Sequence, residues 1–157
     1  MSRVLVEPVE RDRIATAAKH LRDLLERIPA SECYPGYEGF PHGWCGHASE
    51  LLCTYLNDLR LSSVESFYVM GEHHTPHYQS HAWVEAGDLI IDITADQFAA
   101  ELPQVWLTTD RGWHEQFDVK ERWRADVIKK PDIFGWLPRL YKQMTDASAV
   151  GEEQPLV

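Results

Sequence analysis

Three residues that lie far apart in the sequence could together activate a thiol. Cys45 stands at the start of an apolar-periodic stretch, His81 precedes the apolar run 82–85, and Asp92 follows the run 89–91. In such a set the carboxylate fixes the tautomer of the imidazole, and the imidazole takes the proton of the thiol. These residue types therefore predict a nucleophilic Cys45 with His81 as its base and Asp92 as the orienting group.

The expected position of Cys45 at a helix start favours the same chemistry. A helix N-terminus and an adjacent imidazolium lower the pKa of a thiol from its usual value of about 8.5. The same helix end offers unpaired backbone N–H groups to a developing oxyanion. We expect Gly46 to lie at this oxyanion site, and we consider Trp44 and Gln79 as further candidates for it or for the cleft wall.

The spacing of the two apolar runs predicts that His81 and Asp92 meet. Ala86-Gly87 is typical of a two-residue hairpin turn and would place His81 directly opposite Asp92. Opposed residues on one face of a sheet have Cβ atoms about 4.5–5.5 Å apart, which allows an imidazole–carboxylate hydrogen bond. A shift of this register by an odd number of residues would break the pairing.

The elements expected around these residues are two helices followed by an antiparallel sheet. Apolar residues at helical spacing predict helices over 11–28 and 45–59. Strands are expected over 65–70, 82–85 and 89–93. Thr94 to Gln97 is typical of a capping box that would open a short helix through residue 102.

The pattern is weaker in the last third of the chain. It predicts a strand over 105–108, a strand or helix over 118–127 and a helix over 136–144. Polar residues predict a flexible tail over 147–157, after a single domain over 1–146.

Length and composition restrict the class of protein. A chain of 157 residues fits one domain with its own core, and a net charge of −10 argues against nonspecific binding to nucleic acid or to an anionic membrane surface. The three cysteines do not suggest a secreted disulfide framework, and no segment has the character of a signal peptide or a membrane span. We therefore expect a cytoplasmic protein, with export by a signal-less route left open.

Three blocks of the sequence resemble the core of the transglutaminase-like family. Residues 43–52 resemble its Gly-x-Cys pattern on a helix, residues 81–85 its His-Ala-Trp-x-Glu strand, and residues 92–94 its Asp-x-Thr ending. The resemblance implies a papain-like α+β fold in which the nucleophile helix packs on an antiparallel sheet. It also implies Cys45 as nucleophile, His81 as base and acid, and Asp92 as orienting carboxylate.

Two positions differ from the pattern of this family. Ile93 replaces the proline that usually follows the aspartate, and Gly39 stands where papain-type proteases carry an oxyanion-donating glutamine. The second oxyanion donor is therefore unassigned. The family includes proteases, amidases, deamidases and cross-linking enzymes, so the resemblance does not fix the acyl acceptor.

A zinc site is the main competing interpretation of the histidines. Its ligands would come from His73, His74, His77, His81, Cys45 and His47. No Cys-x-x-Cys or His-Glu-x-x-His pattern accompanies them, and histidines in loops are usually solvated. We therefore expect neither a metal nor another cofactor.

Together these features predict a cysteine-dependent acyl-transfer enzyme that acts on a peptide or protein substrate through a thioester. Hydrolysis of a peptide bond or of a glutamine side-chain amide is the first expectation, and transglutaminase cross-linking is the second. The alternative is a noncatalytic module on the same fold that binds a peptide or zinc. The sequence does not predict the oligomeric state.

Overall fold

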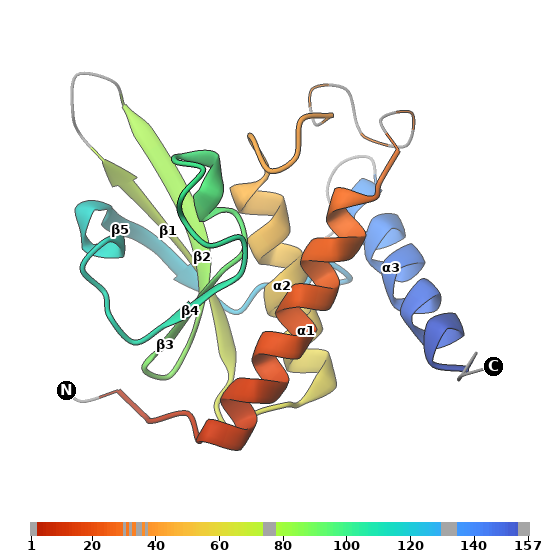
Figure 1. The fold of residues 1–157 in the computed structure, drawn as a ribbon, viewed down its shortest axis with the longest axis horizontal. Coiled ribbons are helices and arrows are strands. Elements are labelled where there is room, and N and C mark those ends of the chain that lie inside the picture. Colours follow the sequence, from red (N-terminus) through yellow and green to blue (C-terminus); the bar gives the residue numbers. More distant parts are fainter. Residues whose placement is uncertain are drawn as a thin grey trace.

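The structure is of the α+β class, which confirms the coarse prediction of fold. The computed structural model describes residues 3–29, 31, 33, 36, 38–73, 78–129 and 135–153. The elements in these ranges are α1 (Pro8–Glu26), α2 (Cys45–Leu59), β1 (Ser66–His73), β2 (Gln79–Ala86), β3 (Leu89–Asp92), the 3₁₀ turn η2 (Ala95–Gln97), β4 (Trp106–Thr108), the 3₁₀ turn η3 (His114–Gln116), β5 (Asp118–Trp123) and α3 (Trp136–Glu153). The strands form one antiparallel sheet in the order β4-β3-β2-β1-β5 (Figure 1). No helix in the described part of the chain is long and apolar enough to cross a membrane.

The helix that begins at Cys45 is the central helix of the structure. Its bounds agree with the prediction, and it packs on β1 and β2 with α1 and α3 beside it. Ala48, Leu52 and Leu56 form part of its buried stripe, which is why this segment is amphipathic and helical. No side chain caps its N-terminus. Cys45 therefore stands in a first turn whose backbone N–H groups lack intrahelical partners.

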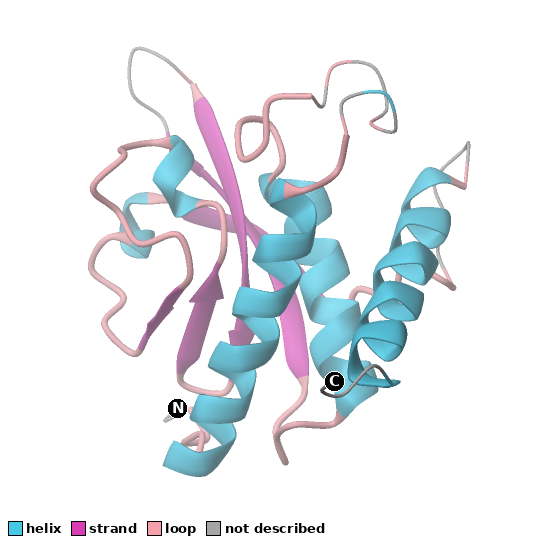
Figure 2. Cartoon of the chain, turned by 45° about the vertical axis from the view of Figure 1, so that its right-hand side comes forward, coloured by secondary structure: helices cyan, strands magenta, loops and turns pink. Residues whose placement is uncertain are grey.

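Side chains of the sheet alternate between two faces, and the helices cover one of them (Figure 2). Alternate residues of β2 starting with Ala82 pack in the large core beneath the helices. Trp83 and Ile90 belong to a smaller apolar cluster on the opposite face. His81 and Asp92 stand two residues from Trp83 and Ile90, so the strand period places them on that opposite face as well.

The hairpin between β2 and β3 differs from the predicted register by two residues. Ala86 pairs with Leu89, so the turn consists of Gly87 and Asp88 and begins one residue later than predicted. The reason is conformational, because the first turn position has a φ of 57° and glycine occupies it. The shift is even, so His81 and Asp92 keep a common face and become diagonal instead of direct neighbours.

The segment before α1 is tied to this hairpin turn. The backbone N–H of Asp88 donates to the Val4 carbonyl (2.8 Å), and the N–H of Val6 donates to the Asp88 carboxylate (3.0 Å). A Cβ on Gly87 would collide with the Val4 carbonyl oxygen, which explains why glycine is required at the turn. These contacts fix residues close to the N-terminus against the edge of the hairpin.

The predicted capping box at Thr94 is wrong. Thr94 makes no side-chain cap bond, and a single 3₁₀ turn follows it instead of a helix through residue 102. Asp96 instead forms a two-point ion pair with the buried Arg22 of α1, at 2.7 and 2.9 Å. Arg22 also donates to the Ile93 carbonyl (2.7 Å), so α1 holds the segment that follows Asp92.

Other boundaries differ from the predictions by a few residues to a few turns. The first helix begins earlier, at Pro8, and β1 extends to His73. The uncertain segment 118–127 is a strand that ends at Trp123. The last helix does not end at residue 144 and continues to Glu153, into the segment predicted as a flexible tail.

Candidate active site

His81 and Asp92 form a buried hydrogen-bonded pair, as the sequence predicted. The ring nitrogen Nε2 of His81 lies 2.8 Å from Oδ2 of Asp92, and the side chains of both residues are fully buried. A carboxylate only accepts hydrogen bonds, so Nε2 carries a proton and donates it. Nδ1 is consequently the ring nitrogen of His81 that can exchange a proton with another group.

A second histidine, which the sequence analysis missed, shares the same carboxylate oxygen. Nε2 of His114 lies 2.8 Å from Oδ2 of Asp92, and the residue is buried. The other oxygen, Oδ1, accepts the backbone N–H of Thr94 (3.0 Å). Asp92 is thus held at both oxygens. His114 lies in the turn η3, where no local motif marks it, so only the tertiary contact could reveal it.

Cys45 lies against the same imidazole from the start of α2. Burial by itself would raise the pKa of this thiol, but the hydrogen-bonding and charge interactions of His81 lower it below the ordinary 9.0, with backbone groups of Ala82 and Gly46 adding to the effect. Nδ1 of His81 makes no hydrogen bond of ordinary geometry to any described residue. The thiol and the ring therefore interact across a looser contact, as is common for catalytic groups before substrate binds.

The charges at this site favour an ion pair between sulfur and ring. Burial by itself would lower the pKa of His81, but the charge and hydrogen bond of Asp92, together with Cys45, raise it to about 9. Burial would likewise raise the pKa of Asp92, but His81 and His114 hold it well below its usual range. At neutral pH this arrangement favours imidazolium and carboxylate, and it stabilises a thiolate on Cys45.

Cys53, on the same helix, shows what a structural cysteine looks like in this protein. Its side chain is fully buried, its thiol donates to the Ser66 carbonyl (3.3 Å), and burial raises its pKa to about 11. None of the three cysteines forms a disulfide in the described part of the chain, and Cys45 is partly exposed. The contrast separates an accessible thiol of lowered pKa from a buried one of raised pKa.

The three oxyanion candidates occupy different places. Gly46 lies in the uncapped first turn of α2, beside the thiol. The Trp44 ring is fully buried and packs edge-on against Phe40, with centroids 5.5 Å apart, so its ring belongs to the core beneath the helices. Gln79 is exposed at the start of β2, two residues before His81.

Gln97 is a better candidate for the unassigned second donor than the sequence suggested. Its carbonyl oxygen accepts the backbone N–H of Gly43 (3.4 Å), in the turn that leads to Cys45. Its amide nitrogen is buried and has no hydrogen-bond partner among the described residues. Gly43 has a φ of 77°, so glycine suits this turn. A side-chain amide beside the start of α2 with unused N–H groups is suited to a developing oxyanion.

The zinc ligands proposed from sequence do not come together, as far as the described residues show. His47 packs against Trp44 and Trp136, and His73 packs against Phe117. His74 and His77 lie outside the described residues.

A different group of possible ligands is formed by His81, Asp92 and His114, whose atoms lie within 4.8 Å of one another. Ligand atoms of a tetrahedral zinc ion stand roughly 3.3 Å apart, because each metal–ligand bond is about 2.0–2.1 Å long. Here both Nε2 atoms are 2.8 Å from one carboxylate oxygen, which is an ordinary length for an N–H···O hydrogen bond. The arrangement therefore fits proton-mediated contacts better than a metal centre.

A cavity of about 980 Å³ in the described part of the chain is not lined by Cys45 or His81. It borders the site through His114, which contacts Asp92, and through Trp83 and Phe117, whose rings pack against His81. Geometry and charge, and not cavity size, therefore make His81, Asp92 and Cys45 the candidate site. Comparison with known proteins found no family model, no curated protein and no solved structure that matches this chain.

Proposed function

We propose that this chain is a cysteine-dependent acyl-transfer enzyme with a transglutaminase-like core and an amide substrate. The observation that supports this most is the contact of the Cys45 thiol with an imidazole whose other nitrogen is hydrogen-bonded to a buried carboxylate. A buried ion-pair network alone could explain His81 and Asp92. It would not explain a partly exposed thiol of lowered pKa at an uncapped helix start.

In the proposed reaction, the thiol of Cys45 gives its proton to Nδ1 of His81. The thiolate attacks the carbonyl carbon of the amide, and a tetrahedral intermediate forms. The imidazolium then donates its proton to the departing amine, and the C–N bond breaks to leave a thioester on the sulfur. Asp92 keeps Nε2 protonated throughout and stabilises the imidazolium, so that Nδ1 remains the reactive nitrogen.

The oxyanion of the intermediate would be stabilised at the start of α2. The first-turn N–H groups of Cys45 and Gly46 lack intrahelical partners, and the amide of Gln97 would supply a side-chain donor. Replacing Gln97 by Ala would remove this donor, and loss of one oxyanion donor lowers kcat by roughly 10²–10³-fold. Since Gln97 does not touch His81 in the described contacts, the alkylation rate of Cys45 should change much less.

Water would then resolve the thioester, with His81 as its base. Hydrolysis of a peptide bond or of a glutamine side-chain amide is our first choice, and resolution by a second amine, which is cross-linking, comes second. The described part of the chain forms one sheet with its helices, and a second domain for an acceptor protein is not among these elements. We place the activity in the cytoplasm, because three cysteines without a disulfide among the described residues suit a reducing compartment.

Alkylation by iodoacetamide tests the proposal at the thiol. Cys45 should react faster than Cys53 at neutral pH, and the pH profile of its rate should have its inflection below that of a free cysteine, which lies at about 8.5. Cys53 should react only at the rate of local unfolding, because it is buried and the pKa of its thiol is about 11. A Cys45 rate equal to that of a urea-denatured control would refute an activated nucleophile.

Intact-mass screening of candidate proteins then separates the possible reactions. Deamidation adds about 1 Da to the substrate and hydrolytic cleavage adds about 18 Da in total, whereas cross-linking joins two masses. The Cys45→Ala variant is the control and should leave every substrate mass unchanged.

The second candidate function is metal binding at His81, Asp92 and His114, and the close approach of their ligand atoms is the observation that favours it. Metal analysis of protein purified without chelator tests this candidate. One equivalent of zinc that is lost in His114→Ala would favour the binding module over the enzyme.

A further inference from the structure

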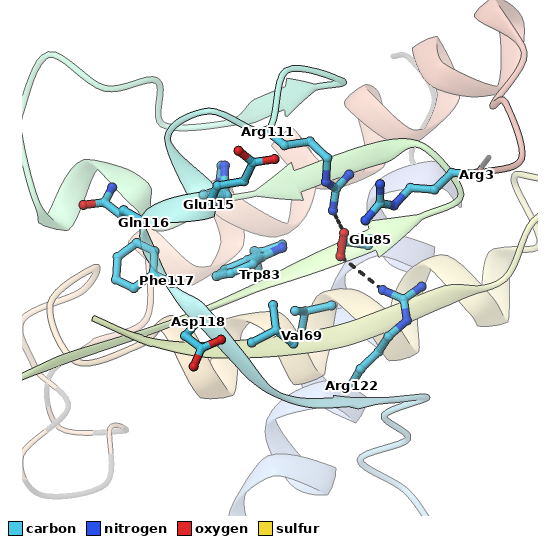
Figure 3. Close-up of a pocket in the computed structure, with 12 residues that line it drawn as sticks. Arg3, Val69, Trp83, Glu85, Arg111, Glu115, Gln116, Phe117, Asp118 and Arg122 are labelled. Atoms are coloured by element: carbon cyan, nitrogen blue, oxygen red, sulfur yellow. Dashed lines mark hydrogen bonds and ion pairs between the residues drawn. The ribbon is translucent and has the colours of Figure 1, made fainter. Parts of the chain in front are cut away.

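The cavity of about 980 Å³ lies over the sheet face that carries Trp83, and its lining shows an unusual arrangement of charge (Figure 3). Three arginines, Arg3, Arg111 and Arg122, surround the carboxylate of Glu85 at one end. Arg111 forms an ion pair with Glu85, and Arg122 forms another at 3.1 Å. The four residues come from the segment before α1, from β2, from the loop before η3 and from β5.

The cavity lining carries three arginines and three carboxylates, and their pairing is uneven. Glu85 and Glu115 are the acidic groups that interact with Arg111, and Asp118 is paired with Lys120 at 2.8 Å. Arg3 is thus the arginine of this lining with no ion pair among the described residues. Burial and repulsion from Arg3 lower the pKa of Arg111, and the same two causes act on Arg122.

A buried hydrogen-bond donor faces the same end of the cavity. The Trp83 side chain is 2% exposed, and its indole N–H has no partner among the described residues. Figure 3 shows the indole nitrogen on the side of the ring that faces Glu85 and the arginines. An unsatisfied buried N–H costs stability, commonly about 1–3 kcal/mol, so its retention calls for an acceptor that the protein itself does not supply.

Arg3 is held at the cavity although it stands near the chain terminus. The next residue, Val4, accepts the N–H of Asp88, and Val6 donates to the Asp88 carboxylate. The segment therefore runs along the hairpin turn, and Figure 3 shows the Arg3 side chain beside Arg111 and Glu85. No ion pair of Arg3 is present within the described ranges, so its guanidinium can bind a ligand.

We propose that this cavity binds a small molecule through a carboxylate or phosphate group, with Arg3, Arg111 and the Trp83 indole N–H as its donors. Guanidiniums match the geometry of both carboxylate and phosphate, and the indole N–H adds an uncharged donor. The cavity volume of about 980 Å³ leaves room for an organic part beyond the anionic group. This site lies apart from Cys45 and does not depend on the proposed acyl-transfer activity.

Isothermal titration calorimetry on the full chain tests the site, at constant ionic strength, with phenyl phosphate, benzoate and benzyl alcohol. One of the two anions should bind with a stoichiometry near one, and the tighter of them identifies the preferred oxyanion. Benzyl alcohol carries no charge and should not bind. The absence of saturable binding by both anions up to about 10 mM would overturn the proposal.

Two substitutions assign the binding to this cavity. Arg3→Gln should weaken the preferred anion by about fivefold or more, because it removes a charged donor without breaking the ion pairs of Glu85. Trp83→Phe keeps an aromatic side chain, removes the N–H and should weaken binding about two- to tenfold. The matched control is Arg13→Gln, on the exposed surface of α1, which should leave the affinity unchanged.

If a folded Arg3→Gln or Trp83→Phe variant, checked by circular dichroism, bound the anion as tightly as the wild type, the proposed site would be wrong. Cys45→Ala separates this proposal from the enzyme proposal. It should bind the anion like the wild type, whatever the outcome of the alkylation experiment.

Discussion

Two buried carboxylates lie close together on the same face of the sheet, and their surroundings differ in one respect. Asp92 is 1% exposed and contacts two imidazoles, whereas Glu85 is 3% exposed and contacts two guanidiniums. Both carboxylates are therefore neutralised inside the protein. Their partners differ, because an imidazole can lose its proton near neutral pH and a guanidinium cannot.

The comparison teaches that the partner of a buried carboxylate decides what the pair can do. His81, with its pKa raised to about 9, can hold a proton and also release it to a leaving group. Arg111 and Arg122 stay charged at every physiological pH, so the Glu85 cluster can only stabilise the structure and bind anions. Removing each carboxylate should consequently disturb different properties of the protein.

The largest expected effect is a loss of reactivity when Asp92, but not Glu85, is replaced. Asp92→Asn should lower the turnover of any substrate found by about 10³–10⁴-fold, because the amide can favour the wrong tautomer of His81. Cys45 alkylation at neutral pH should fall as well. Glu85→Gln should change the alkylation rate of the folded protein by less than about twofold. Equal losses in the two variants would erase the functional distinction between the carboxylates.

The next effect is on stability and belongs to Glu85. Glu85→Gln should lower the free energy of unfolding by about 3 kcal/mol, because Arg111 is left largely buried without its partner. Urea denaturation measures this change. Glu65→Gln is the matched control, since its pair with Arg124 is exposed and should contribute almost nothing. A Glu85 variant as stable as this control would show that the arginines do not need the carboxylate.

The two regions should also differ in how stability depends on pH. The folded pKa of His81, about 9, lies above its ordinary 6.5, so its contribution to stability is complete below pH 6.5 and is lost as the pH rises through 9. The difference in unfolding free energy between wild type and His81→Gln should therefore shrink by on the order of 1–3 kcal/mol across this range. The difference between wild type and Glu85→Gln should stay constant over the same range. If the two stability differences, for His81→Gln and for Glu85→Gln, had the same pH dependence, His81 would not be titrating as proposed.

The smallest effect concerns His114, which touches Asp92 and not the thiol in the described contacts. His114→Ala should slow Cys45 alkylation about tenfold, a size typical of residues that orient a functional group through another. The inflection of the pH–rate profile should also move, because Asp92 loses one of its donors. His114→Gln can return an N–H to Asp92 and should recover part of the loss. Gln116→Ala, in the same turn but exposed, should have no effect on the rate.

Much of the candidate site could be predicted because it follows from local periodicity. The helical spacing of apolar residues after Cys45 placed this residue at a helix start, and the structure agrees. The strand period placed His81 and Asp92 on one face, and this result survived an error of two residues in the register. An even error leaves side chains on the same face, so the pairing did not require the correct turn.

Residue types and their periodicity thus determined the candidate triad and the α+β class of this protein. Only the tertiary structure decided that His114 shares Asp92, that Gln97 reaches the turn before Cys45, and that arginines from distant segments meet at Glu85. Local patterns specify which face of a helix or strand a residue occupies, but they do not specify which distant side chain will contact it. Such contacts arise only when the elements pack, because packing brings loops and turns without periodicity against the sheet.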